Sequence, residues 1–150
     1  MNLKVKRLDE RARMPKYATD GSGCFDIYGL VNQATVPQVV RTGQPAIFKT
    51  GLAFEIPEGY VMLIFSRSGQ GFNYDMRLAN CVGVIDSDYR GELMVKLTKD
   101  VGPESQAIVN EGVAIAQGML IKLDRIKFIE VEELSLTDRG TGGFGSTSKV

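Results

Sequence analysis

The densest group of side chains able to do chemistry lies in residues 78–95, "LANCVGVIDSDYRGELMV". Two alternating apolar segments flank a polar tip, a pattern that indicates a hairpin. The tip carries two carboxylates, a phenol and a guanidinium, on Asp86, Asp88, Tyr89 and Arg90. A carboxylate can orient a water molecule or accept a proton, and a guanidinium can pair with an anion. The alternative is a polar turn in which Asp and Gly only serve the turn geometry.

A second group directly follows the apolar run Tyr60–Phe65. The sequence "SRSG" at residues 66–69 places Arg67 and Ser68 where a predicted strand leaves the core and enters a loop. Loops held by a rigid scaffold often carry binding residues, and both side chains donate hydrogen bonds that suit phosphate oxygens. Taken alone, an Arg-Ser-Gly triplet is a weak signal.

The last twelve residues, "RGTGGFGSTSKV" (139–150), contain four glycines and four hydroxyl side chains and offer little to fill a core. One interpretation is a disordered tail, because glycine loses much backbone entropy on ordering. The other is a segment that orders around a ligand, with backbone N–H groups and hydroxyls facing phosphate. In that case Arg139 supplies charge and Phe144 supplies a flat face for stacking.

Several classes of site are excluded by composition. Histidine is absent, which removes the commonest general base and zinc ligand. Cys24 and Cys81 have no C-x-x-C spacing, and two sulfurs without histidine do not complete an ordinary zinc site. We expect both cysteines to be buried, reduced thiols, so acid–base chemistry must come from other side chains.

Charge and hydropathy limit the partners. Eighteen basic and eighteen acidic residues cancel, and no block of like charge suggests a surface for nucleic acid. The N-terminal "MNLKVKRLDERARMPK" has no apolar core of a signal peptide, and Tyr60–Phe65 is too short to span a bilayer. We therefore expect a cytoplasmic protein with no nucleic acid and no membrane partner, and the composition leaves a small anionic ligand open.

Three familiar motifs fail on context. Gly140, Gly142 and Gly145 form a G-x-G-x-x-G, but too little chain follows for the helix that a dinucleotide fingerprint requires. No P-loop sequence occurs. A calcium loop starting at Asp86 would place Arg90 and Leu97 at positions that need oxygen ligands.

The elements that must position these residues are strands. Apolar residues recur with period two in "GLAFEI" (51–56), "ELMVKLTK" (92–99), "VAIAQGMLIKL" (113–123) and "KFIEV" (127–131). The run Tyr60–Phe65 is apolar throughout, which predicts a strand buried on both faces. Turn signals separate these segments at 57–59, 86–91 and 102–105, and only 67–72 or 75–79 could form a turn or two of helix. The prediction is one all-β domain, a barrel or double-sheet jelly roll.

Five stretches, in order, resemble the trimeric dUTPase family, the dUTP diphosphatases: "ATDGSGCFDIYG", "SRSGQG", "NCVGVIDSDYRGEL", "GVAIAQ" and "RGTGGFGST". The match runs from about Ala18 to Thr147. It implies a jelly-roll β-barrel in residues 1–138 that assembles as a homotrimer, with active sites at subunit boundaries. It also implies a flexible arm, 139–150, that closes over a neighbouring subunit's active site. The implied reaction hydrolyses dUTP to dUMP and pyrophosphate, which keeps uracil out of DNA and supplies dUMP for thymidylate synthesis.

The resemblance also assigns roles by position. Asp86 would hold the water that attacks the α-phosphate, and Tyr89 would lie under the deoxyribose and exclude a 2′-hydroxyl. The cofactor would be Mg²⁺ chelated by the triphosphate, with Asp26 reaching it at most through bound water. The other implied substrate-binding residues are Arg67, Ser68, Gly69 and Gln117 for phosphates, Asn80 and Val84 for uracil, and Arg139, Phe144, Gly145, Ser146 and Thr147 in the arm.

Alternatives remain open for some of these residues. Gln117 could be a polar residue inside a strand, and Arg67 could be the structural partner of a carboxylate. The chain also departs from the family pattern at Ala114, where arginine is usual, and at Cys24, where glycine is common. The departure at Ala114 suggests a second hypothesis, a trimer whose main role is to bind a regulatory protein partner. A third is a dCTP deaminase, which shares the family's fold but acts at the base.

Overall fold

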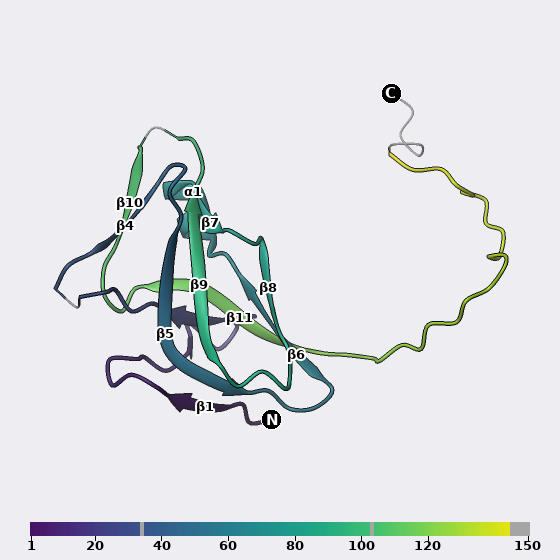
Figure 1. Cartoon of the computed structure of the whole chain (residues 1–150), viewed down its shortest axis with the longest axis horizontal. Coiled ribbons are helices and arrows are strands. Elements are labelled where there is room, and N and C mark those ends of the chain that lie inside the picture. Colours follow the sequence, from purple (N-terminus) through teal and green to yellow (C-terminus); the bar gives the residue numbers. More distant parts are fainter. Residues whose placement is uncertain (34, 103, 145–150) are drawn as a thin grey trace.

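The computed structural model describes residues 1–33, 35–102 and 104–144. It contains two larger antiparallel sheets, a two-stranded ribbon and one short helix (Figure 1). The first sheet has the order β1 (Lys4–Arg7), β5 (Ala46–Glu55), β9 (Glu92–Lys99), β7 (Met76–Leu78). The second has the order β2 (Lys16–Tyr17), β3 (Phe25–Tyr28), β11 (Ala114–Lys122), β6 (Tyr60–Phe65), β8 (Val82–Ile85). The ribbon pairs β10 (Gln106–Val109) with β4 (Gln38–Arg41), and α1 spans Ser68–Tyr74.

The core is built from side chains of both larger sheets. Phe48, Leu52 and Leu97 of the first sheet and Ile27, Met62 and Ile115 of the second are fully buried in one apolar cluster. Alternation explains the contribution of β9, because Leu93, Val95 and Leu97 are buried while the residues between them are not. The predicted all-β class is therefore confirmed, and the burial of Val61, Met62 and Ile64 in β6 agrees with a strand covered on both faces.

Strand β5 contains an irregularity in its pairing with β9 between Lys49 and Ala53. Gly51 there has a φ of 65°, and a Cβ on it would lie 2.8 Å from the Cβ of Ala12. Only glycine fits such a backbone and such a contact. The amide of Gly51 donates to Oε1 of Glu92 at 2.8 Å, and its carbonyl accepts from the amide of Leu8 at 2.7 Å. The kink in β5 is thereby joined to both the N-terminal segment and the start of β9.

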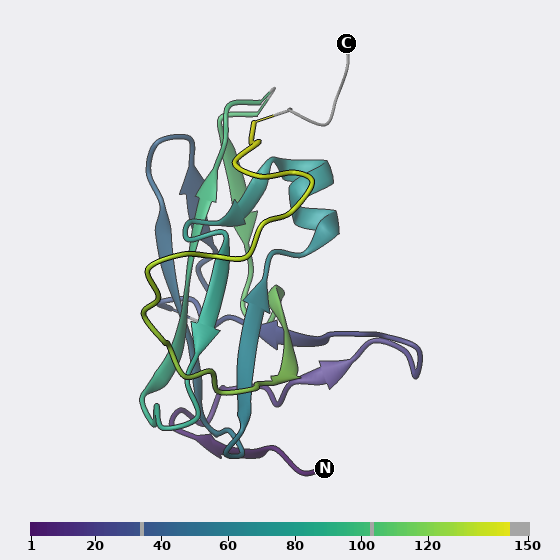
Figure 2. The ribbon, with the colours of Figure 1, turned by 90° about the vertical axis from the view of Figure 1, so that its right-hand side faces the viewer.

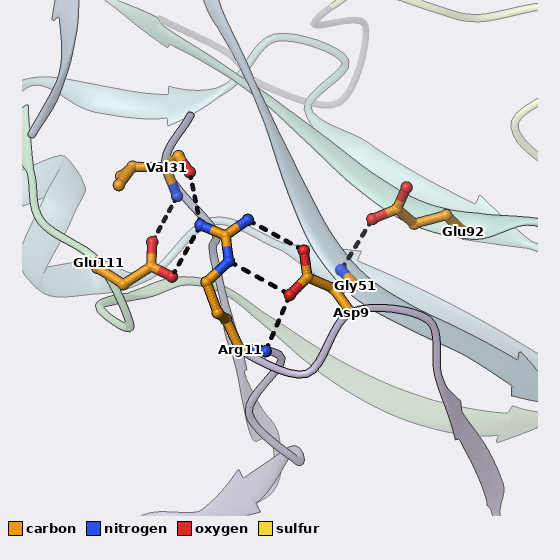
Figure 3. Close-up of polar contacts among 6 residues, drawn as sticks. All are labelled: Asp9, Arg11, Val31, Gly51, Glu92 and Glu111. Carbon is orange, nitrogen blue, oxygen red and sulfur yellow. Dashed lines mark hydrogen bonds and ion pairs between the residues drawn. The ribbon is translucent and has the colours of Figure 1, made fainter. Parts of the chain in front are cut away.

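A polar cluster around Arg11 ties the N-terminal segment to two loops (Figure 3). Its guanidinium pairs with Oδ2 of Asp9 at 3.0 Å and donates to the carbonyl of Val31 at 3.3 Å. Glu111 accepts the amide of Val31 at 2.7 Å and lies 3.5 Å from the same guanidinium. Hydrogen bonds from the Arg11 side chain and amide hold the pKa of Asp9 below its usual value.

This lowered pKa predicts an acid-dependent contribution of Asp9 to stability. Because the folded-state pKa lies below the unfolded value, the stabilisation is complete above about pH 4 and is lost as the pH falls through the folded-state pKa. Asp9→Asn should therefore slightly lower the urea midpoint at neutral pH, since the pair is open to solvent. The difference from wild type should vanish in acid. A difference that stays constant from neutral to strongly acidic pH would contradict this assignment.

Three local expectations were tested by the fold. Residues 67–72 do enter a helix, α1, but 75–79 do not: Asp75 has a φ of 51° and ends the helix, and β7 follows in register with β9. The strand predicted at 127–131 is wrong, because that segment pairs with no strand among the residues that the structure describes. It runs outside the two sheets (Figures 1 and 2). Its Phe128 side chain is 88% exposed.

The cysteines depart from the expectation of two buried thiols. Both are free, but Cys24 is only half-buried and Cys81 is exposed, with a φ of 63° in the turn before β8. Among the residues that the structure describes, no helix is long and apolar enough to cross a membrane.

Candidate active site

The first candidate pocket lies where β3, β11 and the start of α1 meet. It has a volume of about 540 Å³ and is lined by Asp26, Arg67, Ser68, Gly69 and Gln117, among others. Strand β11 explains the convergence, because its Gln117 pairs in register with Asp26 of β3 on one side and Phe65 of β6 on the other. All four predicted phosphate-binding residues therefore come together, with Asp26 beside them.

Arg67 is held by the chain itself. Its Nε donates to Oδ1 of Asp26 at 3.1 Å, and its Nη1 donates to the carbonyl of Ala114 at 3.3 Å. The structural pairing considered for Arg67 thus exists, and Asp26 is the partner. A guanidinium has five N–H donors, so this pairing fixes its orientation and leaves donors for a ligand.

Two further side chains hold this pocket together and were not predicted from the sequence. Gln70, which is buried, donates through Nε2 to the same Ala114 carbonyl at 3.1 Å. Ser66 accepts the amide of Leu78 at its hydroxyl, 2.9 Å away, and its carbonyl accepts from Gln117 at 2.8 Å. Gln70 and Ser66 differ from an ordinary loop glutamine or serine only in the backbone groups that they bond. The sequence therefore carries no signal for either residue.

Asp86 lies elsewhere on the chain, in the turn between β8 and β9. It lines a second pocket of about 610 Å³ together with Ser87, Asp88 and Arg90. Two hydrogen bonds hold the turn: the amide of Tyr89 donates to the carbonyl of Asp86 at 3.2 Å, and the side-chain Nη1 of Arg90 donates to the carbonyl of Ser87 at 2.6 Å. The Asp86 side chain is exposed and makes no hydrogen bond or ion pair within the described part of the chain. Its carboxylate is therefore free to bind a water molecule.

The predicted base-reading residues line a third pocket of about 460 Å³, between β8 and β9. Asn80 and Val84 contribute to it, and Val84 is exposed. The turn at its edge is tight, because the amide of Val82 donates to the carbonyl of Asn80 at 2.7 Å. Tyr89 lies in the turn after β8, exposed over nearly half of its surface.

The described residues of the C-terminal arm, 139–144, line none of these three pockets. Arg139 donates to the carbonyl of Gly142 at 2.8 Å, within the arm itself, and Phe144 is fully exposed. Figure 1 shows the segment after β11 running away from the sheets. The predicted residues Gly145, Ser146 and Thr147 lie outside the described residues. Within the described residues of one chain, the predicted groups therefore line different pockets or lie in the arm, and none of these three pockets contains them all.

The fold and these pockets define an all-β protein with an arginine-lined pocket suited to an anionic ligand and an unpaired carboxylate on a hairpin turn. A family model described as dUTPase matches residues 10–148, nearly the whole chain. The chain therefore belongs to the dUTPase family.

Relatives and solved structures agree with this membership. The chain is 39% identical to a deoxyuridine 5′-triphosphate nucleotidohydrolase of Nautilia profundicola, over 99% of this chain and 100% of the relative. It is 36% identical to the protein of the same name from Helicobacter pylori, over 98% and 97% of the two chains. The structure of a Staphylococcus bacteriophage 80alpha dUTPase with dUpNHpp is similar with a TM-score of 0.84 and 28% identity, covering 99% of both chains.

Proposed function

We propose that this chain hydrolyses dUTP to dUMP and pyrophosphate through a water molecule that Asp86 orients toward the α-phosphate. As a member of the dUTPase family the chain is a dUTP diphosphatase. The observation that carries the role of Asp86 is its exposed carboxylate, held on a turn by a backbone hydrogen bond and unpaired among the described residues. The reaction removes a precursor of uracil in DNA and yields dUMP for thymidylate synthesis.

Orientation rather than basicity would dominate the chemistry of Asp86. An aspartate is a weak base at neutral pH, so holding the water in line with the phosphorus contributes more than proton affinity. Arg67, Ser68, Gly69 and Gln117 would bind the phosphates, and their shared pocket supports this. Arginine on the phosphates would stabilise the negative charge that the leaving pyrophosphate carries.

Base and sugar selection would come from the hairpin. Asn80 and the backbone beside Val84 would hydrogen-bond the uracil edge, and the closeness of the backbone would exclude the methyl group of thymine. Tyr89 would fill the space that a 2′-hydroxyl needs. The third pocket, which Asn80 and Val84 line, and the exposure of the Tyr89 ring support this assignment.

The complete site would form only in a homotrimer. The three pockets are separate in one chain, and the segment after β11 exposes a series of apolar side chains, Ile126, Phe128, Ile129, Leu134 and Leu136. An extended apolar segment with nothing covering it is typical of a surface that docks on another molecule. We propose that the arm, 139–150, then closes over a neighbouring subunit's site, where Arg139, Phe144, Gly145, Ser146 and Thr147 would contact the substrate.

Members of the dUTPase family generally use Mg²⁺, and the residues of this chain suit a metal that arrives on the substrate. Among the described residues no group of three or more Cys, Asp or Glu side chains could hold a metal ion, and Asp26 is paired with Arg67. We propose that Mg²⁺ is chelated by the triphosphate and that Asp26 reaches it at most through bound water. When bound, the ion would withdraw negative charge from the phosphates.

A pyrophosphate-release assay with dUTP, dTTP, dCTP and UTP tests the proposal. We expect release from dUTP in the presence of Mg²⁺ and little from the other three. No release from dUTP, even at high protein concentration, would overturn the proposal. Ammonia release from dCTP would instead establish a deaminase.

The pairing of Arg67 gives a separate prediction. Lysine keeps the charge but cannot bond Asp26 and the Ala114 carbonyl at once, so Arg67→Lys should raise KM for dUTP roughly tenfold, the loss of one charged hydrogen bond. Steady-state kinetics measures this. Arg77→Lys is the matched control, because Arg77 makes a similar two-point pair with Asp100, at 2.7 and 2.9 Å, outside the phosphate pocket. Equal effects of the two substitutions would contradict a role for Arg67 in phosphate binding.

A further inference from the structure

The ring of Tyr89 lies directly against Gly91, two residues later in the chain. A Cβ placed on Gly91 would lie 2.5 Å from Cζ and 2.9 Å from Cε2 of that ring and would also overlap its hydroxyl. These three atoms are the nearest neighbours of such a Cβ, and all belong to Tyr89. The ring can occupy its position only because residue 91 has no side chain.

A hydrogen bond from the hydroxyl also fixes the position of the Tyr89 ring. The hydroxyl donates to the carbonyl of Glu92 at 3.1 Å. Glu92 is itself fixed, because it pairs in register with Ala53 and its carboxylate accepts the amide of Gly51 at 2.8 Å (Figure 3). The ring therefore folds back over Gly91 onto a backbone carbonyl that the kink in β5 holds in place.

A side chain at residue 91 would move the ring and not the fold. Gly91 is not among the glycines with positive φ, so the backbone accepts alanine without strain. The atoms that must give way are the far end of a side chain that is 44% exposed. The ring can therefore turn toward solvent at little cost to stability.

We propose that Gly91 is a positioning residue for sugar selection, which sets the place of the Tyr89 ring and thereby the exclusion of a 2′-hydroxyl. The inference rests on the proposed function, in which Tyr89 lies under the deoxyribose. A ring displaced from Gly91 and released from the Glu92 carbonyl no longer fills a fixed volume. Steric exclusion of an added hydroxyl requires a rigid neighbour, because a mobile one yields to it.

The test is the ratio of kcat/KM for dUTP to that for UTP, measured for wild type and Gly91→Ala. We expect the ratio to fall about tenfold or more, since small displacements of a positioning group have effects of that order. Gly21→Ala is the matched control, because a Cβ on Gly21 meets no atom within 4 Å and its φ is also ordinary. Its ratio should equal that of wild type.

Double substitution distinguishes positioning from a general loss of structure. If Gly91 acts through the ring, Gly91→Ala should have no further effect on the ratio once Tyr89→Ala is present. Tyr89→Phe, which removes only the hydrogen bond to Glu92, should lower the ratio in the same direction. If Gly91→Ala does not fold, Tyr89→Phe still tests whether rejection of UTP depends on a ring that is held in a fixed position.

Two failures are separable. A wild-type protein that does not hydrolyse dUTP overturns the proposed function. A wild-type protein that hydrolyses dUTP and rejects UTP, with an unchanged ratio in Gly91→Ala or an equal further loss in the Tyr89→Ala background, overturns the positioning role alone.

Discussion

Asp86→Asn is expected to lower kcat for dUTP by about 10²–10⁴-fold while leaving affinity for dUpNHpp nearly unchanged. Asparagine has the same shape as aspartate but is neutral and carries an NH₂ donor in place of one acceptor oxygen, so it orients and polarises the attacking water less well. The turn should keep its geometry, because the hydrogen bond from Tyr89 uses the backbone carbonyl of residue 86. Steady-state kinetics gives kcat, and calorimetry with the analogue gives affinity.

Asp88→Asn is the matched control for this experiment. Asp88 lies two residues away, is exposed and lines the same pocket, but has no proposed part in catalysis. Its kcat should stay near that of wild type. An unchanged kcat in Asp86→Asn, or equal losses in both variants, would rule out the role assigned to Asp86.

Deletion of residues 139–150 is expected to lower kcat/KM for dUTP roughly 10²-fold, the loss of charge-assisted hydrogen bonds to phosphate and of stacking on uracil. Fold and assembly should survive. Arg139 donates within the arm, and Phe144 is exposed, so neither contributes to the core. Kinetics, thermal unfolding and the mass of the assembly in solution together measure these outcomes.

A chain that lacks only residues 148–150 is the control for the arm, because those residues have no proposed contact with substrate. It should retain wild-type kcat/KM. Full activity in the chain truncated after residue 138 would refute closure by the arm. A truncated protein with fewer subunits per assembly than wild type would show instead that the arm holds the assembly together.

The period-two pattern predicted the sheets well because burial on one face imposes it. Leu93, Val95 and Leu97 alternate into the core as their spacing indicates. The same pattern at 127–131 gave a wrong strand, since a strand also needs a hydrogen-bonded neighbour and the described part of the chain supplies none there. Period alone cannot tell whether the partner strand exists in the same chain.

Motif spacing selected which residues to examine but could not give their contacts. Asp26 and Arg67 are far apart in sequence, and their pairing depends on β11 lying between β3 and β6. The contact between Gly91 and the Tyr89 ring likewise depends on how the side chain folds back over the backbone, which the sequence does not show. Long-range contacts of this kind follow from topology, which local sequence does not encode.

Because of the kink at Gly51, the residues that can be accepted at one position depend on parts of the chain that are distant in sequence. Ala12 and Leu30 leave no room for a Cβ on Gly51, while Glu92 and Leu8 bond its amide and carbonyl. A bulkier residue at position 12 or 30 would displace Gly51 and so disturb its hydrogen bond to Glu92 at the start of β9. The residues that can be tolerated at positions 12 and 30 are therefore limited by the start of β9, which lies far away in the sequence.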